Sequence, residues 1–260
     1  MKWKAIGQSV IGTSHAANGI LCEDSHEYTM LNHDEKGQTF IGVVCDGAGS
    51  ARFGGEAAKI TCSIAVNQFA DLVISLKNVE ESHVREVAEN IFDKLNDLSK
   101  ERDTQLNEFS CTFLGCILKP ERSVFFQIGD GAIIRSDDLG YYSLLWWPDN
   151  GEYQNQTTFL VDDPSISNLK VKILEEPSDE VALFTDGLQL LALNTFDKTV
   201  HQPFFYPMFQ ALRTLKTDEE IGIVNGKLGD YLNSDGINLR TDDDKSLILV
   251  TRIPVDGNYL

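Results

Sequence analysis

Aspartates that border apolar runs are the residues of this chain best suited to chemistry. Asp46, Asp130 and Asp186 each follow a hydrophobic run, and each stands directly before a glycine. Asp243 has the reverse arrangement, because the acidic residues 242–244 lead into the hydrophobic run 247–250. Carboxylates that meet at one edge of a sheet repel one another unless a cation lies between them. Clusters made only of oxygen ligands suit hard divalent ions such as Mg²⁺ or Mn²⁺, so the pattern predicts a metal-dependent hydrolase.

The bland explanation of these aspartates is that they are turn residues. An Asp-Gly pair is a common turn signal, and taken singly each aspartate is explained well enough by it. The repetition favours the metal hypothesis, because Asn or Ser would serve equally well in a solvent-exposed turn.

A pair of divalent ions would make a nucleophilic side chain unnecessary. The ions lower the pKa of a water molecule and neutralise charge on a phosphoryl group, and phosphoryl transfer needs little beyond positioning and electrostatics. In agreement, the chain contains no G-x-S-x-G elbow, no G-x-x-x-x-G-K-[ST] loop and no G-x-G-x-x-G turn opening a helix after a strand.

Composition sets the class of protein. The chain has 260 residues and a net charge of −18, which disfavours binding to nucleic acid and to anionic membranes. We expect a single domain over residues 1–260. The cysteine count, 5, is odd and includes no C-x-x-C pair, which indicates buried thiols in a reducing compartment. With no stretch that approaches a membrane span, the sequence predicts a cytoplasmic protein.

The elements that must position the aspartates are strands in hairpins, with helices grouped between them. Strands are predicted at 3–12, 28–31, 40–45, 110–118, 123–128, 132–135, 181–185 and 247–253. Helices are predicted from residue 54, over 80–98, from 188, and over 204–215 and 221–232. Residues 13–21 are expected to form a loop, 110–135 a β-meander, and 140–171 an irregular insertion that serves as a flap. This grouping indicates an α+β sandwich.

Six motifs, taken in order along the chain, resemble those of the metal-dependent Ser/Thr protein phosphatases of type 2C. They are Cys22-Glu23-Asp24-Ser25-His26, Asp46-Gly47-Ala48-Gly49-Ser50, Ser110-Cys111-Thr112, Ile128-Gly129-Asp130-Gly131, Thr185-Asp186-Gly187 and Asp243-Asp244-Lys245-Ser246. Each motif alone is weak, but six in this order over residues 12–250 are a strong match.

The resemblance implies a four-layer αββα sandwich, with two antiparallel β-sheets flanked by helices and metals at one edge. It implies two Mg²⁺ or Mn²⁺ ions and a third site at Asp130. The implied metal ligands are Asp24, Asp46, Gly47 through its carbonyl, Asp130, Asp186 and Asp243. The implied catalytic residues are Asp46 and Asp186, with His26 or a bound water as the proton donor.

Several positions depart from the family pattern and suggest a divergent bacterial branch. Gly19 stands nearest the place of an arginine that grips the substrate phosphate, and His15 or Arg52 is a candidate replacement. Ala48 stands where some members have a proton-donating histidine. Gly131-Ala132 replaces a Ser-Arg pair, and Asp244 replaces an asparagine.

The expected activity is hydrolysis of phosphoserine and phosphothreonine in proteins by a water that two metals activate. Its partners would be a phosphoprotein substrate and a Ser/Thr kinase or that kinase's target. One alternative is a pseudophosphatase of the same fold that acts as a binding module. The other is a small-molecule phosphoesterase, with substrate choice set by residues 141–163.

Overall fold

The fold is two five-stranded antiparallel sheets packed face to face. The computed structural model describes residues 2–33, 37–148, 157–164 and 166–253. The first sheet has the order β1 (Lys2–Val10), β12 (Lys245–Ile253), β9 (Glu180–Phe184), β6 (Ala132–Ser136) and β7 (Tyr142–Leu144). The second has the order β2 (Ser25–His33), β3 (Gly37–Cys45), β4 (Phe113–Leu118), β5 (Ser123–Ile128) and β8 (Lys170–Leu174).

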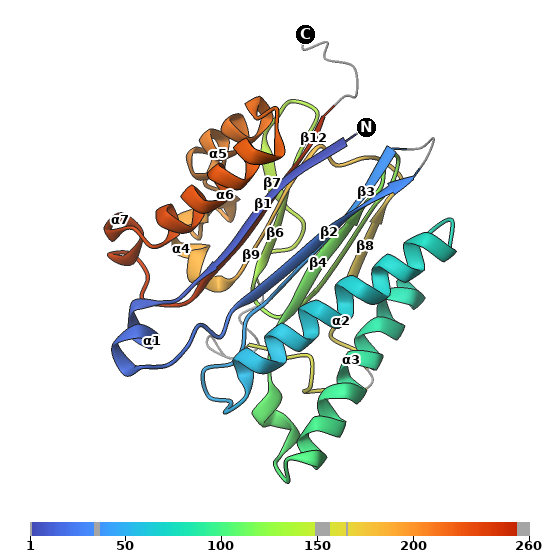
Figure 1. The fold of residues 1–260 in the computed structure, drawn as a ribbon, viewed down its shortest axis with the longest axis vertical. Coiled ribbons are helices and arrows are strands. Elements are labelled where there is room, and N and C mark those ends of the chain that lie inside the picture. The colour runs from blue at the N-terminus through green and yellow to red at the C-terminus, as the bar shows by residue number, and fades with distance from the viewer. Residues whose placement is uncertain (1, 34–36, 149–156, 165, 254–260) are drawn as a thin grey trace.

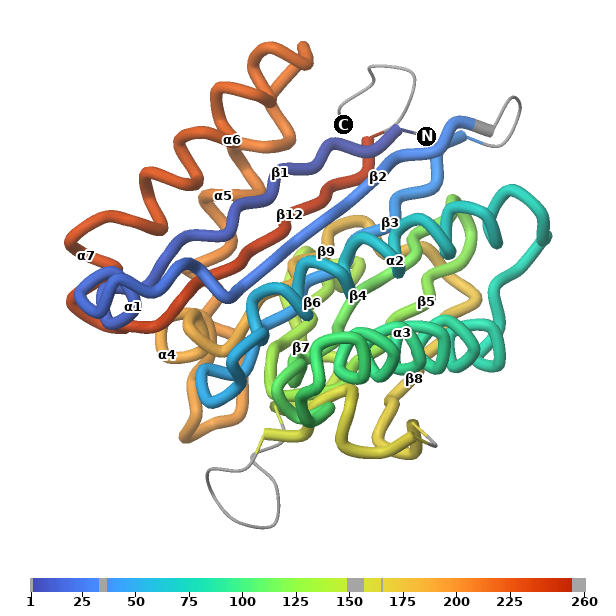
Figure 2. Tube along the Cα trace, turned by 60° about the horizontal axis from the view of Figure 1, so that its bottom comes forward, coloured from blue at the N-terminus to red at the C-terminus, as the bar shows by residue number. Residues whose placement is uncertain are grey.

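Helices cover the outer face of each sheet, which completes the four-layer αββα sandwich (Figures 1 and 2). Helices α2 (Gly54–Ser75) and α3 (Glu81–Glu101) lie on the second sheet, and α5 (Gln202–Thr214) and α6 (Asp218–Leu232) lie on the first. Short elements complete the chain: α1 (Thr13–Asn18), η1 (Leu106–Phe109), η2 (Asp186–Leu188), α4 (Gln189–Ala192), β10 (Leu193–Asn194), β11 (Thr199–Val200) and α7 (Asp235–Asn238). The predicted fold class is therefore confirmed.

The central strands are hydrophobic on both faces because each face meets a different core. In β12, Leu247 and Leu249 pack under α5 and α6, whereas Ile248 and Val250 face the other sheet. Neighbouring side chains on a strand point to opposite faces. A strand between two cores consequently has an unbroken apolar run, which is the signal that predicts these strands from the sequence.

Antiparallel pairing brings the aspartates to one edge of the sandwich. Asp46 follows the last residue of β3, and Asp130 lies between β5 and β6. Asp186 comes directly after Phe184 and Thr185 at the end of β9, and Asp243 comes just before β12. Because alternate strands run in opposite directions, the ends of β3, β5 and β9 lie at the same edge as the starts of β2, β6 and β12.

The predicted β-meander over 110–135 is wrong in its last strand. Strands β4 and β5 pair as a hairpin, but β6 joins the other sheet, beside β9 and β7. The crossing occurs at Gly129, whose φ of 105° lies in a region that favours glycine. Asp130 consequently stands at the corner where the chain passes from one sheet to the other.

Two further expectations differ from the structure. Residues 13–18 form helix α1, which Gly19 ends in the left-handed conformation, rather than a loop. By length and composition alone, helix α2 is long and apolar enough to cross a membrane, contrary to the expectation that no stretch approaches a span. Its buried residues, such as Ala57, Val66 and Phe69, belong to the core between the helices and the second sheet, which accounts for that composition.

The segment expected to form a flap, 140–171, begins in β7 and ends in β8, so it connects the outer strands of the two sheets. Its residues Leu160, Val161, Ile166 and Leu169 are buried in the core with α3. Residues 149–156 and 165 of this segment lie outside the described residues.

We expect the aromatic cluster in the core between the second sheet and helices α2 and α3 to contribute much of the stability. Phe126 on β5 is fully buried between Phe69 and Phe113, with ring centroids 5.0 Å and 4.8 Å away. Phe126→Ala should lower the free energy of unfolding by about 3–5 kcal/mol, because it leaves a cavity between rigid neighbours. Leu139→Ala, at a side chain that is 82% exposed, should change it by less than about 0.5 kcal/mol. Denaturant unfolding measures both, and equal effects of the two variants would contradict this account of the core.

Candidate metal centre

Three of the predicted ligands converge at the site edge. Asp46, Asp130 and Asp186 each place one carboxylate oxygen within 4.8 Å of the others. They come from the end of β3, from the corner between β5 and β6, and from the start of η2. The convergence that the sequence pattern suggested is therefore present for these three residues, and both sheets contribute to it.

Asp46 and the loop that follows it are joined by hydrogen bonds to the segment before β4. The Asp46 N–H donates to Thr112 Oγ1 at 2.8 Å, and the Thr112 N–H donates to the Asp46 carbonyl at 2.8 Å. Gly47 pairs with Cys111, and the Ala48 N–H donates to the Ser110 carbonyl. The small triplet 110–112 thus fixes the backbone of the aspartate.

Close backbone approach explains why glycine follows two of the aspartates. A Cβ at Gly47 would lie 2.3 Å from the carbonyl carbon of Gly54, at the start of α2. A Cβ at Gly187 would lie 2.0 Å from the carbonyl oxygen of Asp244. Any side chain at these positions would push apart the segments that hold Asp46, Asp186 and Asp243.

Asp24 lies beside this group and is almost fully buried. Its Oδ2 accepts a hydrogen bond of 2.7 Å from Thr185 Oγ1, and Thr185 directly precedes Asp186. The Ser246 N–H in turn donates to the same Thr185 hydroxyl at 2.9 Å. Thr185 therefore ties together three segments that carry acidic residues.

Asp130 has one satisfied and one unsatisfied carboxylate oxygen. Thr157 Oγ1 donates to its Oδ2 at 2.6 Å, and Gln189 Nε2 donates to its backbone carbonyl at 2.6 Å. Its Oδ1 is buried and has no hydrogen-bond partner among the described residues. A buried carboxylate oxygen without a donor is costly unless a cation meets it.

The two aspartates directly before β12, Asp243 and Asp244, have different hydrogen-bond partners. The Asp243 carboxylate accepts the Asp244 N–H at 2.8 Å, and its carbonyl accepts from Lys245 Nζ at 3.2 Å. Asp244 instead turns into the protein, where it accepts the N–H groups of Gly12 and Glu23, both at 2.6 Å. Asp243 is the member of the pair whose charge acts on Asp46 and Asp186.

The crowding of acidic groups raises their pKa values. Burial, followed by the charges of Asp24 and Asp186, raises the pKa of Asp46 well above its ordinary value. Burial raises the pKa of Asp186 to about 7, aided by the charges of Asp130 and Asp243 and opposed by a hydrogen bond with Asp46. Burial also raises the pKa values of Asp24, Asp130 and Asp243.

These residues fit a divalent metal. The donors are carboxylate oxygens, which Mg²⁺ and Mn²⁺ prefer, and Gly47 adds a backbone carbonyl in the same loop. The unpartnered oxygen of Asp130 and the mutual repulsion of the group both favour an added positive charge. Asp24 and Asp243 lie outside the group of three, and their charges reach Asp46.

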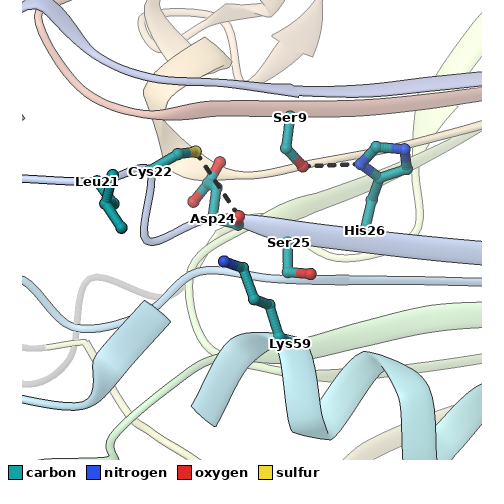
Figure 3. Close-up of a pocket in the computed structure, with 7 residues that line it drawn as sticks. All are labelled: Ser9, Leu21, Cys22, Asp24, Ser25, His26 and Lys59. Atoms are coloured by element: carbon teal, nitrogen blue, oxygen red, sulfur yellow. Dashed lines mark hydrogen bonds between the residues drawn. The ribbon is translucent and has the colours of Figure 1, made fainter. Parts of the chain in front are cut away.

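Three other residues that the sequence suggested have different surroundings. His26 Nδ1 is 2.7 Å from Ser9 Oγ, and its ring lies against Gly7 of β1, so these contacts hold it between two edge strands (Figure 3). Arg52 places its guanidinium 5.1 Å from the Phe53 ring centroid. His15 contacts Asp244 and Glu23 and is only partly exposed.

A pocket of about 400 Å³ opens beside Asp24, between β1, β2 and α2. Ser9, Cys22, Ser25 and Lys59 are among its lining residues, and Figure 3 shows the Lys59 side chain reaching from α2 toward Asp24 and Ser25. Of the predicted metal ligands, only Asp24 lines this pocket.

Comparison with known proteins identifies the family. The family model described as "Protein phosphatase 2C" matches residues 11–233. Serine/threonine-protein phosphatase 3 of Escherichia coli (strain K12) is 33% identical over 255 residues, which is 96% of this chain and 98% of that protein. The chain belongs to the protein phosphatase 2C family, as the six motifs predicted.

Solved structures agree on the fold. A bacterial serine phosphatase aligns with a TM-score of 0.61 at 15% identity, over 98% of this chain and 99% of that one. The serine/threonine phosphatase Stp1 from Staphylococcus aureus aligns with a TM-score of 0.59 at 16% identity, over 96% and 95%. The αββα arrangement is thus shared with structures of low sequence identity.

Sequence reasoning missed the residues that hold the acidic groups in place. In the sequence, Thr185 stands out only as the end of a strand, and Asp244 only as an aspartate where the family pattern has asparagine. In the structure, their hydrogen bonds join segments that are far apart in the chain. Helix α1 had a local signal, because Gly12 and Gly19 flank a short run of helix-compatible residues. The partners of Thr185 and Asp244 had no such signal, because each lies far away in the sequence: 61 and 161 residues for Ser246 and Asp24 from Thr185, and 232 residues for Gly12 from Asp244.

The raised pKa of Asp186 predicts that the metal-free protein becomes less stable as the pH rises. Because the folded chain holds a proton on Asp186 up to about pH 7 and the unfolded chain releases it near 3.8, the free energy of unfolding falls as pH rises between these values. The slope reaches about 1.4 kcal/mol per pH unit for one group. Asp186→Asn should therefore exceed the wild type in stability at pH 7 in EDTA, with a gain that shrinks toward pH 4.

Denaturant unfolding at several pH values measures this difference. Asp71→Asn, at an exposed position of α2, is the matched control and should follow the wild type. If Asp186→Asn were less stable than the wild type at pH 7 without metal, the carboxylates would not repel as described.

Proposed function

We propose that this chain is a Mg²⁺- or Mn²⁺-dependent phosphatase that hydrolyses phosphoserine and phosphothreonine in proteins. The observation that carries the proposal is the group formed by Asp46, Asp130 and Asp186 in a chain of the protein phosphatase 2C family. The relative in Escherichia coli is named a serine/threonine-protein phosphatase, which supports the same substrate class.

We infer that Asp24, Asp46, Asp186 and Asp243, with the Gly47 carbonyl, would hold two ions, and that Asp130 would serve a third. When bound, the ions supply a water of lowered pKa and neutralise charge on the phosphoryl group. The chain's own part is positioning: Thr112 fixes the Asp46 backbone, and Thr185 fixes the Asp24 carboxylate. Such partners orient ligands and tune their affinity.

The pseudophosphatase alternative is not favoured, because every acidic residue that the family resemblance implies is present in the chain. Burial, together with the charges of neighbouring carboxylates, raises the pKa values of Asp46 and Asp186, and a bound cation would offset both effects. Partners under this proposal are phosphoproteins, with a Ser/Thr kinase or its target acting on the same proteins. All five cysteines are free thiols, which supports our proposal of a cytoplasmic location.

Loss of the Asp46 carboxylate should remove most of the activity. We expect the wild type with Mn²⁺ to hydrolyse a phosphoserine peptide and p-nitrophenyl phosphate. Asp46→Asn should reduce kcat/KM by more than the roughly 10- to 100-fold that follows loss of an outer-shell partner. Phosphate release measures the rate, and titration calorimetry measures Mn²⁺ binding.

The matched control is Asp230→Asn, at an exposed residue of α6, which should leave both rate and binding unchanged. Full activity of Asp46→Asn would refute the metal assignment. A wild type that binds Mn²⁺ but releases no phosphate from either substrate would refute the enzyme and favour a binding module. Faster turnover of metabolite phosphates than of phosphopeptides would move the substrate class to small molecules.

A further inference from the structure

His15 occupies a defined position at the site end of the sandwich. It lies on α1, near α4 and α7 at the same end of the molecule (Figures 1 and 2). Its Nδ1 is 2.9 Å from Asp244 Oδ2, and its side chain is 18% exposed. The imidazole therefore has one nitrogen turned into the protein and part of its ring open to solvent.

Asp244 is held too firmly to be a chance neighbour of this ring. Its Oδ1 accepts the Gly12 N–H and its Oδ2 accepts the Glu23 N–H, both at 2.6 Å. A carboxylate with both oxygens engaged cannot rotate, so it fixes the imidazole plane as well. The asparagine expected at this position would turn an NH₂ group toward one of its donor neighbours. Aspartate instead accepts from the Gly12 N–H, the Glu23 N–H and His15 Nδ1.

The other ring nitrogen points toward the loop that follows Asp46. A Cβ built at Gly49 would lie 4.0 Å from His15 Nε2 and 3.9 Å from Glu23 Oε2. Nε2 itself lies 3.7 Å from Glu23 Oε2. A Cβ at position 49 would therefore be in van der Waals contact with both groups, so Gly49 lies directly against the Nε2 side of the ring.

Each neighbour of His15 belongs to a segment that carries an implied metal ligand. Glu23 precedes Asp24, Gly49 lies in the loop after Asp46, and Asp244 follows Asp243. The ring thus stands where these three segments meet, and its charge acts on Asp243. The charged groups that face it are Glu23 from the segment before β2, and Asp243 and Asp244 from the segment before β12. Residues 47–50 contribute no titratable side chain.

We propose that His15 is the proton donor to the leaving seryl or threonyl oxygen, an inference that rests on the proposed function. Water adds its oxygen to phosphorus and releases a proton to solvent. The bond between phosphorus and the side-chain oxygen breaks with its electron pair on that oxygen, which takes a proton from Nε2. The ring then regains a proton from solvent, while Asp244 keeps Nδ1 as the donor on its inner side.

This assignment replaces an absent group with one from a different element. Ala48 stands where some members of the family have a histidine, and helix α1 brings His15 to the same loop from outside. His26, the other histidine near the site, has its Nδ1 bound to Ser9 and its ring packed against Gly7, as Figure 3 shows for the Ser9 contact.

Leaving-group dependence tests the proposal. With Mn²⁺, His15→Gln should lower kcat for a phosphoserine peptide by about 10²–10⁴, the usual contribution of a proton donor, and remove the alkaline limb of its pH profile. With p-nitrophenyl phosphate, whose leaving group departs without a proton, the loss should stay below about tenfold. An equal loss on both substrates, or no loss on either, would overturn the proposal.

A second variant separates proton transfer from a structural role. His15→Ala should regain peptide hydrolysis when imidazole is added, and calorimetry should show Mn²⁺ affinity equal to that of the wild type. His201→Ala, at an exposed histidine before α5, should resemble the wild type and ignore imidazole. Loss of Mn²⁺ binding in His15→Ala, or no rescue, would mean that the ring only holds the ligand segments in place.

The two levels of inference fail separately. If the wild type hydrolyses both substrates and Asp46→Asn does not, the proposed function stands, whatever His15→Gln shows. A wild type inert on both substrates would overturn the function and the role of His15 together.

Discussion

Repulsion among buried carboxylates is the constraint on which the rest of the structure depends. Asp46, Asp130 and Asp186 are held within 4.8 Å of one another, and the charges of Asp24 and Asp243 reach the same point. No surface turn requires such an arrangement, and water does not screen it well in a partly buried site. A fold keeps such a group together when the surrounding structure is rigid and either a proton or a cation relieves the charge.

Rigidity comes from the way the segments are joined at the site edge. Thr112 and Cys111 fix the backbone of Asp46 and Gly47, Thr185 joins Asp24 to Ser246, and Asp244 joins residues 12 and 23. Gly47 and Gly187 permit these segments to approach more closely than any other residue would. The three hydrophobic cores behind this edge, two under the helices and one between the sheets, keep the strand ends in register.

The departures from the family pattern are related to one another in this structure. Asp244 in place of asparagine supplies two acceptor oxygens, and those oxygens take up Gly12, Glu23 and His15 together. Gly49, in the loop after Asp46, lies against the His15 ring without a side chain of its own. The absence of a histidine in the loop, the aspartate at 244 and the helix at 13–18 are three parts of one local arrangement.

The sequence by itself determined the strands that are buried on both faces, the position of each acidic residue relative to a strand end, and the family; it did not predict the strands β7, β8, β10 and β11. It could do so because a strand buried on both faces has a continuous apolar run, and because a turn aspartate is adjacent to that run in the chain. It failed where the deciding contact is remote: β6 joins the other sheet through a positive φ at Gly129, and the predicted meander could not show that. Tertiary structure alone decided that Asp243 faces the carboxylate group while Asp244 turns to His15, and that His26 is bound to Ser9. The direction of a side chain depends on partners more than 200 residues away for Asp244, and no local pattern encodes those partners.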